Sequence, residues 1–140
     1  METTAMSATL AKETPAVRTT GKAGNVALWV LQVAAAAMLG MAGFGKLTGT
    51  PDMIALFDAV GIGQWFRYVT GALEVGGAVL LLVPALAGVG ALLLAGVMLG
   101  AVLTHLFIIG GSPVVPLVLM IVTGYIAFAR RDRTLRLLGR

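Results

Sequence analysis

The sequence contains no cysteine and little charge, and each absence excludes a class of function. Without a thiol, the chain forms no disulfide, offers no cysteine nucleophile and supplies no cysteine ligand to an iron–sulfur cluster. Charged side chains make up 11% of its 140 residues, whereas a soluble domain has about 25%. Hydrophobic residues make up 59%, so the composition predicts a helical membrane protein.

The longest stretch without a formally charged side chain runs from Val75 to Ala129, between Glu74 and Arg130. Its 55 residues far exceed the roughly 20 that one membrane-spanning helix needs. The stretch must therefore contain two or more helices joined by uncharged turns. His105, the one histidine of the sequence, lies within it.

Apolar segments and turn residues divide the chain into four predicted spans. Pro84 separates the second span from the third, and a Gly-Gly-Ser-Pro turn at 110–113 separates the third from the fourth. The expected fold class is all-α, an integral membrane four-helix bundle over residues 25–129. Its spans are predicted at about residues 25–45, 64–83, 86–109 and 114–129.

A short amphipathic helix is predicted between the first two spans. Pro51 and Gly61 frame it, and apolar residues alternate in it with Asp52 and Asp58. An interfacial position suits such a helix better than a spanning one. A signal peptide is the rival interpretation of the first span, but the apolar segment is too long for a usual one, so we expect a retained span.

The two ends of the chain carry its net charge of +4. Residues 1–24 are predicted to form a disordered cytoplasmic tail, and residues 130–140 a basic cytoplasmic tail in contact with anionic lipid. The connections between the spans have balanced charge or none. The positive-inside rule then places both termini in the cytoplasm, which four spans satisfy. This charge pattern indicates topology and lipid contact, with no nucleic-acid partner.

Small residues at four-residue spacing indicate where helices can approach closely. Gly96 and Gly100 form such a pair in the third span, and Ala72 and Gly76, followed by Gly77, do so in the second. We expect helix contacts at these positions, and the partner helix is left open.

Few polar side chains lie within the predicted spans. Glu74 lies about 13 Å deep, at 1.5 Å per residue from the outer interface. Because side chains tilt toward the N-terminus of their helix and the second and third spans run in opposite directions, Glu74 and His105 lean toward one another. The candidate ligand- or proton-site residues, all in the outer half of the bundle, are Glu74, His105, Lys46, Arg67 and Thr70. No catalytic residue is assigned.

The same cluster also has a structural interpretation, in which buried ion pairs fix the register of the helices without any ligand. Lys46 and Arg67 also fit ordinary interfacial positions. Gln32, in the inner half of the first span, is expected to be separate. One histidine and one buried acid are too few ligands for a stable metal site, so no metal is expected. A quinone or small lipid needs only an apolar cleft with one or two donors, which His105 with Lys46 or Arg67 could supply.

Four segments together resemble one known family. They are GFGKL at 43–47, FDAVG at 57–61, TGALEVGGAVLLLVP at 70–84, and the third span from Val97 to His105. Over about residues 26–130 this pattern is similar to the DoxX family of small four-helix membrane proteins. The most specific features are the glycine-then-glutamate of the second span and the late histidine of the third.

The resemblance implies a protein of the bacterial inner membrane, with Lys46, Glu74 and His105 as the family's polar residues. Some relatives are associated with quinone-linked oxidation of sulfur compounds or with oxidative-stress complexes, beside soluble redox partners. The expected function is a membrane subunit or anchor of a redox-linked system, with no independent catalytic activity. The absence of cysteine argues against thiol chemistry by this chain.

Other functions and partners stay open at this point. A non-enzymatic scaffold or assembly factor, in which the cluster is structural, is the main alternative. A small proton-coupled transporter is disfavoured because no inverted repeat is evident. The expected partners are the lipid bilayer and soluble redox proteins, with a homo-oligomer also open. No cofactor is established, and a quinone is the candidate ligand.

Overall fold

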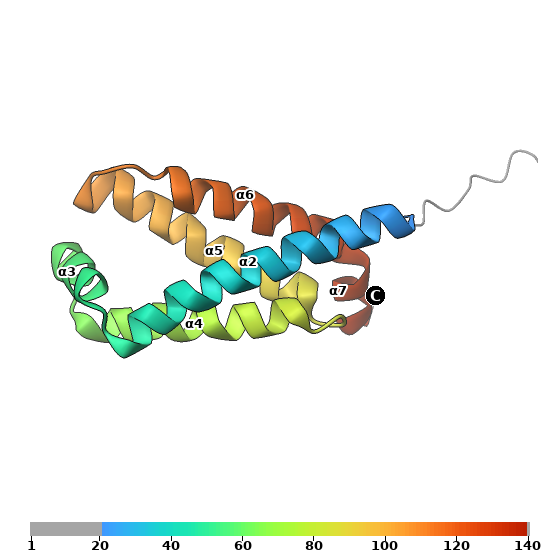
Figure 1. Cartoon of the computed structure of the whole chain (residues 1–140), viewed down its shortest axis with the longest axis horizontal. Coiled ribbons are helices and arrows are strands. Elements are labelled where there is room, and N and C mark those ends of the chain that lie inside the picture. The colour runs from blue at the N-terminus through green and yellow to red at the C-terminus, as the bar shows by residue number, and fades with distance from the viewer. Residues whose placement is uncertain (1–20, 140) are drawn as a thin grey trace, which may run out of the picture.

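Long helices joined by short connections form an elongated bundle (Figure 1). The computed structural model describes residues 21–139, in which no strand occurs, so the predicted all-α membrane bundle is confirmed. The elements are α2 (Lys22–Thr48), α3 (Pro51–Val60), α4 (Gln64–Leu82), α5 (Ala87–Thr104), η1 (His105–Ile109), α6 (Val114–Ala129) and α7 (Arg131–Leu137).

The described residues test only part of the predicted tails. Residues 1–20 of the N-terminal tail lie outside the described part of the chain. Helix α2 begins at Lys22, three residues before the predicted first span. At the other end, residues that were predicted only as a basic tail form helix α7.

Three helical segments are long and apolar enough to cross a membrane individually, namely α2, α4, and α5 continued by η1. Helix α6 has 16 residues, which at 1.5 Å per residue is about 24 Å, short of a hydrocarbon core of about 30 Å. Helix α7 follows it after a bend of 63°. Counted with α7 as one bent pair, α6 brings the number of candidate spans to as many as four, the predicted number, while the bend turns the charged α7 across the end of the bundle.

The helices pack in a simple order, with α2 on α4, α4 on α5, and α5 on α6. The side chains of Leu39, Leu81, Leu94 and Ile126 are fully buried at the centre of these contacts. Many exposed side chains on the outer faces are valine, leucine, isoleucine and phenylalanine. Such an apolar exterior suits contact with lipid.

Close approach of two backbones fixes how α2 and α4 cross. A Cβ atom added at Gly43 would lie 2.8 Å from the carbonyl oxygen of Gly71 and 3.0 Å from the Cβ of Glu74. A Cβ added at Gly71 would lie 3.0 Å from the Cβ of Lys46. Each glycine therefore makes room for the charged side chain of the facing helix, so the crossing point brings Lys46 and Glu74 together.

The predicted glycine contacts of the second and third spans differ in part from those observed. Gly77 packs tightly against Leu94, as its small size suggests, but a Cβ added at Gly96 or Gly100 would meet no atom within 4 Å in the described chain. The expectation of close helix contact is therefore wrong for a single chain at Gly96 and Gly100, and also at Gly76, where an added Cβ would again meet no atom within 4 Å. Gly96 and Gly100 lie instead along an open cleft.

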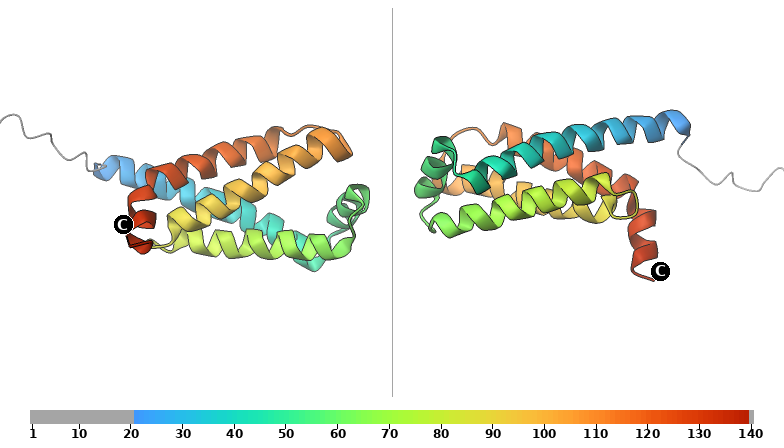
Figure 2. Two further views of the ribbon diagram at one scale, coloured as in Figure 1. Left: turned by 180° about the vertical axis from the view of Figure 1, so that it is seen from behind. Right: turned by 60° about the horizontal axis from the view of Figure 1, so that its bottom comes forward.

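The bundle has two different ends. One carries α3, and we call it the α3 end; the other carries the start of α2, the α4–α5 turn and α7, and we call it the terminal end (Figure 1). Seen from behind, α4 and the α5–α6 pair spread apart toward α3 (Figure 2). This divergence leaves space between the helices at the α3 end.

Helix α3 forms where the amphipathic helix was predicted, and it is not merely peripheral. Its residues Met53, Leu56, Phe57 and Val60, at helical spacing, line the cleft. The rings of Phe57 and Phe66 meet edge to face with centroids 5.9 Å apart, which holds α3 against α4. The helix thus forms a wall of the space between the diverging spans.

Candidate functional site

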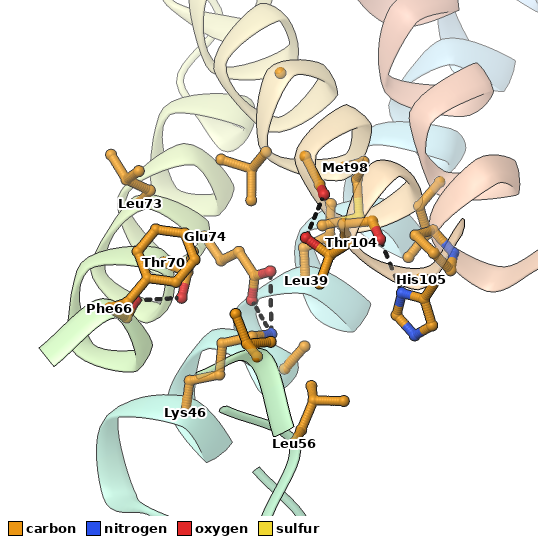
Figure 3. A pocket seen from close by; sticks show the side chains of 18 of the residues that line it. Leu39, Lys46, Leu56, Phe66, Thr70, Leu73, Glu74, Met98, Thr104 and His105 are labelled. Atoms are coloured by element: carbon orange, nitrogen blue, oxygen red, sulfur yellow. Dashed lines mark hydrogen bonds and ion pairs between the residues drawn. The ribbon is translucent and has the colours of Figure 1, made fainter. Parts of the chain in front are cut away.

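The space at the α3 end is a cleft of about 920 Å³, lined by residues of all the helices except α7. Its walls are mostly apolar, contributed by leucine, valine, methionine and phenylalanine side chains. The polar side chains that line it are Lys46, Thr70, Glu74, Thr104, His105 and Ser112. Figure 3 shows how Lys46, Thr70, Glu74, Thr104 and His105 are arranged around the cleft.

Lys46 and Glu74 form an ion pair in this cleft. The Nζ atom of Lys46 donates to both carboxylate oxygens of Glu74, at 2.8 Å from Oε2 and 3.1 Å from Oε1. The side chains are 11% and 3% exposed, so each charge depends on the other for its stabilisation. An ammonium group has three donors, so one N–H of Lys46 is left for a further acceptor.

Arg67 is buried and contacts the backbone of Lys46, but it does not line the cleft. Its guanidinium donates to the carbonyl oxygen of Lys46, and its Nε donates to Oε1 of Gln64 at 2.7 Å. The guanidinium also lies 4.4 Å from the centroid of the Tyr68 ring. Arg67 therefore ties the C-terminal end of α2 to α4, where the helix dipole favours a cation.

His105 begins a π-helical turn, which widens the end of α5 at the cleft. Such turns are often found at functional sites. Its Nδ1 lies 2.8 Å from the carbonyl oxygen of Ala101. Because a carbonyl oxygen only accepts hydrogen bonds, Nδ1 carries a proton, and Nε2 is the ring nitrogen left for a ligand.

The two threonines of the cleft use their hydroxyl protons within their own helices. Thr70 donates to the carbonyl oxygen of Phe66 at 2.8 Å, and Thr104 donates to that of Gly100 at 2.8 Å. Their oxygens keep a lone pair that could accept a hydrogen bond from a ligand.

Of the predicted residues, Lys46, Thr70, Glu74 and His105 meet at the cleft, while Arg67 lies outside it. In the described chain the carboxylate of Glu74 bonds to Lys46, and no hydrogen bond joins it to His105. The expected leaning of Glu74 and His105 therefore brings them to one cleft without a direct contact (Figure 3).

Sequence reasoning missed the apolar walls of this site. The contribution of α3 was hidden because its apolar residues match an interfacial helix equally well. Thr104 was missed as a polar lining residue, although it immediately precedes His105 in an otherwise apolar span. No convergence of three or more histidine, aspartate or glutamate side chains that could hold a metal is found over residues 21–139.

Gln32 is separate from the cleft, and it belongs to a second buried polar group at the terminal end. Its Oε1 accepts from Nε of Arg130 at 2.9 Å, and its Nε2 donates to the carbonyl oxygen of Leu81 at 2.9 Å. Nη1 of Arg130 donates to Oδ1 of Asn25 at 2.9 Å. The signal for this group was a lone amide within an apolar span, since a buried amide needs partners.

The sequence of the chain matches a known protein family. The model of the DoxX-like family matches residues 30–129. The chain belongs to the DoxX-like family. Neither the curated proteins nor the solved structures give a match to it. The matched region extends from α2 to the end of α6, so the whole cleft of this DoxX-like protein lies within it, and the family membership supports a membrane protein.

Proposed function

We propose that this DoxX-like protein is a membrane subunit that binds an amphiphilic ligand of the quinone class in the cleft. One observation carries the proposal: a cleft of about 920 Å³ with apolar walls and a small number of polar side chains. Small-molecule sites typically occupy about 300–1,000 Å³ and combine apolar walls with a few placed polar groups.

The polar groups of the cleft match the two oxidation states of a quinone ring. A ring carbonyl oxygen would accept the remaining N–H of Lys46, and a hydroxyl of the reduced ring would donate to Nε2 of His105. The isoprenoid tail would lie against apolar side chains such as Leu92, Leu93 and Val97. In this role the chain supplies binding and hydrogen bonds, and we assign electron transfer to a soluble partner protein.

The proposal includes a location, the bacterial inner membrane, with both termini in the cytoplasm. Basic residues gather at the terminal end, on Arg130, Arg131, Arg133 and Arg136, which supports that orientation. The α3 end, and with it the cleft, would then lie in the outer half of the membrane.

A non-enzymatic scaffold is the second candidate function, and a different observation favours it. The Lys46–Glu74 ion pair joins α2 to α4, and Arg67 ties the same two helices together. In a scaffold these contacts would serve only to hold the bundle, and lipid would occupy the cleft. The two candidates differ in what happens when a side chain fills the cleft. The quinone-binding subunit would lose its ligand, whereas the scaffold would be unaffected.

Gly96→Leu is designed to fill the cleft without touching its polar groups, because Gly96 lines the cleft and has open space around its added Cβ. Binding of a short-tailed benzoquinone to the detergent-purified protein, measured by isothermal titration calorimetry, is expected to weaken at least tenfold. His105→Ala is expected to weaken binding as well, through the loss of Nε2.

The matched control is Gly76→Leu, since Gly76 is also helical, also meets nothing within 4 Å, and does not line the cleft. It is expected to bind the quinone as the wild type does. Absence of binding by the wild type, or equal binding by Gly96→Leu, would refute the quinone site and favour the scaffold.

A further inference from the structure

The terminal end of the bundle carries a strong excess of positive charge. Among the described residues there, the basic side chains are Lys22, Arg130, Arg131, Arg133 and Arg136, and Asp132 is the acidic one. The ion pair found in residues 21–139 lies at the opposite end, between Lys46 and Glu74. Most of the positive charge at the terminal end is therefore not neutralised within the described chain.

Arg130 shows this imbalance most clearly. It is only 6% exposed, and its Nε and Nη1 donate to the neutral side-chain amides of Gln32 and Asn25. Its Nη2 is buried and has no hydrogen-bond partner in the described chain. Burial lowers the pKa of Arg130, and the charge of the nearby Arg133 lowers that pKa further, yet a guanidinium stays protonated. A buried cation in this position favours an anion nearby.

Helix α7 lies across the terminal end and forms one side of a shallow groove there. Its Thr134 packs directly against the backbone of Gly88, and Nη1 of Arg133 donates to the carbonyl oxygen of Pro84 at 3.1 Å. The groove has a volume of about 440 Å³. It is lined by Pro84 and Ala85 of the α4–α5 turn and by Arg133, Arg136 and Leu137 of α7.

We propose that this groove binds the headgroup of an anionic phospholipid, with the phosphodiester held between Arg133 and Arg136. The planar guanidinium groups match phosphate oxygens in geometry and charge. Two features favour a membrane lipid as the occupant. The groove begins two residues beyond the end of α4, at the membrane boundary, and the neighbouring Leu82 and Val83 are exposed for contact with acyl chains.

The bound headgroup would also hold α7 in place. It would neutralise charge on α7 and add contacts between that helix and the α4–α5 turn, the same two elements that the Arg133–Pro84 hydrogen bond joins. The site is distinct from the quinone cleft and lies at the other end of the bundle, so either site can fail without the other.

The test measures lipid binding to the detergent-purified full chain by native mass spectrometry. Phosphatidylglycerol is expected to bind at least tenfold more tightly than phosphatidylcholine. R133Q/R136Q is expected to lower the affinity for phosphatidylglycerol at least tenfold. The matched control is K22Q/R131Q, which removes the same charge from the same end but from residues outside the groove, and it is expected to change affinity less than threefold.

Three results would overturn the proposal. Equal losses in the two double variants would show diffuse attraction instead of a site, and equal binding of the two lipids would show no headgroup recognition. If inorganic phosphate alone at equal concentration occupied the site to the same extent as the lipid, the occupant would be a free anion.

If R133Q/R136Q unfolds, the single variant R136Q serves instead, since no hydrogen bond of the Arg136 side chain is found within residues 21–139. A loss of affinity under threefold in R136Q would refute the site.

Discussion

At the scale of single residues, the charge of Glu74 depends on one partner. The carboxylate is 3% exposed and bonds to Lys46 alone among the described side chains. A carboxylate of this kind is stabilised in an apolar bundle only while its counter-ion is in place. This dependence makes the pair a sensitive test of what holds α2 to α4.

Glu74→Gln is expected to destabilise the protein by about 3–5 kcal/mol, because it leaves the ammonium of Lys46 buried without a counter-charge. Thermal unfolding in detergent, followed by circular dichroism, measures the loss. The double variant Lys46→Met with Glu74→Gln is expected to recover most of it, since the unpaired charge is then gone. A Glu74→Gln variant as stable as the wild type would contradict a buried pair.

The exposed Asp58 provides the control for this prediction. Its carboxylate accepts from Gln64 at 2.7 Å but lies at the surface of α3. Asp58→Asn is expected to change stability by less than about 0.5 kcal/mol, because surface substitutions usually have small effects. A loss as large as that of Glu74→Gln would mean that removing any acid, buried or not, destabilises the chain.

At the scale of helices, the crossing of α2 and α4 depends on two glycines. Gly43→Ala would place a Cβ 2.8 Å from the carbonyl oxygen of Gly71, so the two helices must separate. The expected cost is about 1–3 kcal/mol, the usual penalty of overpacking. Unfolding of the variant in detergent measures this cost.

Gly40→Ala is the control one turn earlier on the same helix. Its Cβ would lie 3.6 Å from the Cβ of Ala78, an ordinary contact, and alanine favours a helix over glycine. We expect unchanged or slightly raised stability. If Gly40→Ala and Gly43→Ala were equally destabilising, the close crossing at Gly43 and Gly71 would not be the cause.

At the scale of the whole molecule, both described termini lie at one end of the bundle, opposite α3 (Figure 1). This arrangement suits an even number of spans. The absence of cysteine means that a single introduced cysteine can report the orientation without any background from native thiols.

Leu138→Cys and Ile62→Cys probe the two ends of the bundle, at positions where the native side chains are 71% and 51% exposed. In intact cells, a membrane-impermeant maleimide is expected to label position 62 directly and position 138 only after permeabilisation. Labelling of both positions from one side would contradict the four-span arrangement, and the reverse pattern would contradict cytoplasmic termini.

Much of the helical framework could be predicted from the sequence, because hydropathy is a property of local segments. Pro84 and the turn at 110–113 mark the connections where the structure has them. The helix α7 was not predicted, since most of its residues are charged and it has no buried apolar face; it packs through Thr134 against Gly88. The Gly96–Gly100 contact was predicted wrongly, because a small-residue motif describes one helix and leaves open whether another helix faces it.

The candidate site was predictable in its residue types but not in its pairing. Glu74 and His105 can be found from the sequence alone, because few other polar side chains lie within the apolar spans. That Glu74 pairs with Lys46, and that Gln32 pairs with Arg130, depends on contacts across 28 and 98 positions of the chain. Side-chain direction along a helix restricts such contacts without selecting one.

The sequence by itself determined the class of protein, the positions of the helices and the short list of polar residues, because apolar length and charge act locally. Only the tertiary structure decided that α5 and α6 diverge from α2 and α4 to open a cleft, and that α7 folds across the other end. The physical reason is that both features depend on close contacts between segments far apart in the sequence. Gly43 meets Gly71 where α2 crosses α4, and Gly88 of α5 meets Thr134 of α7 at the terminal end.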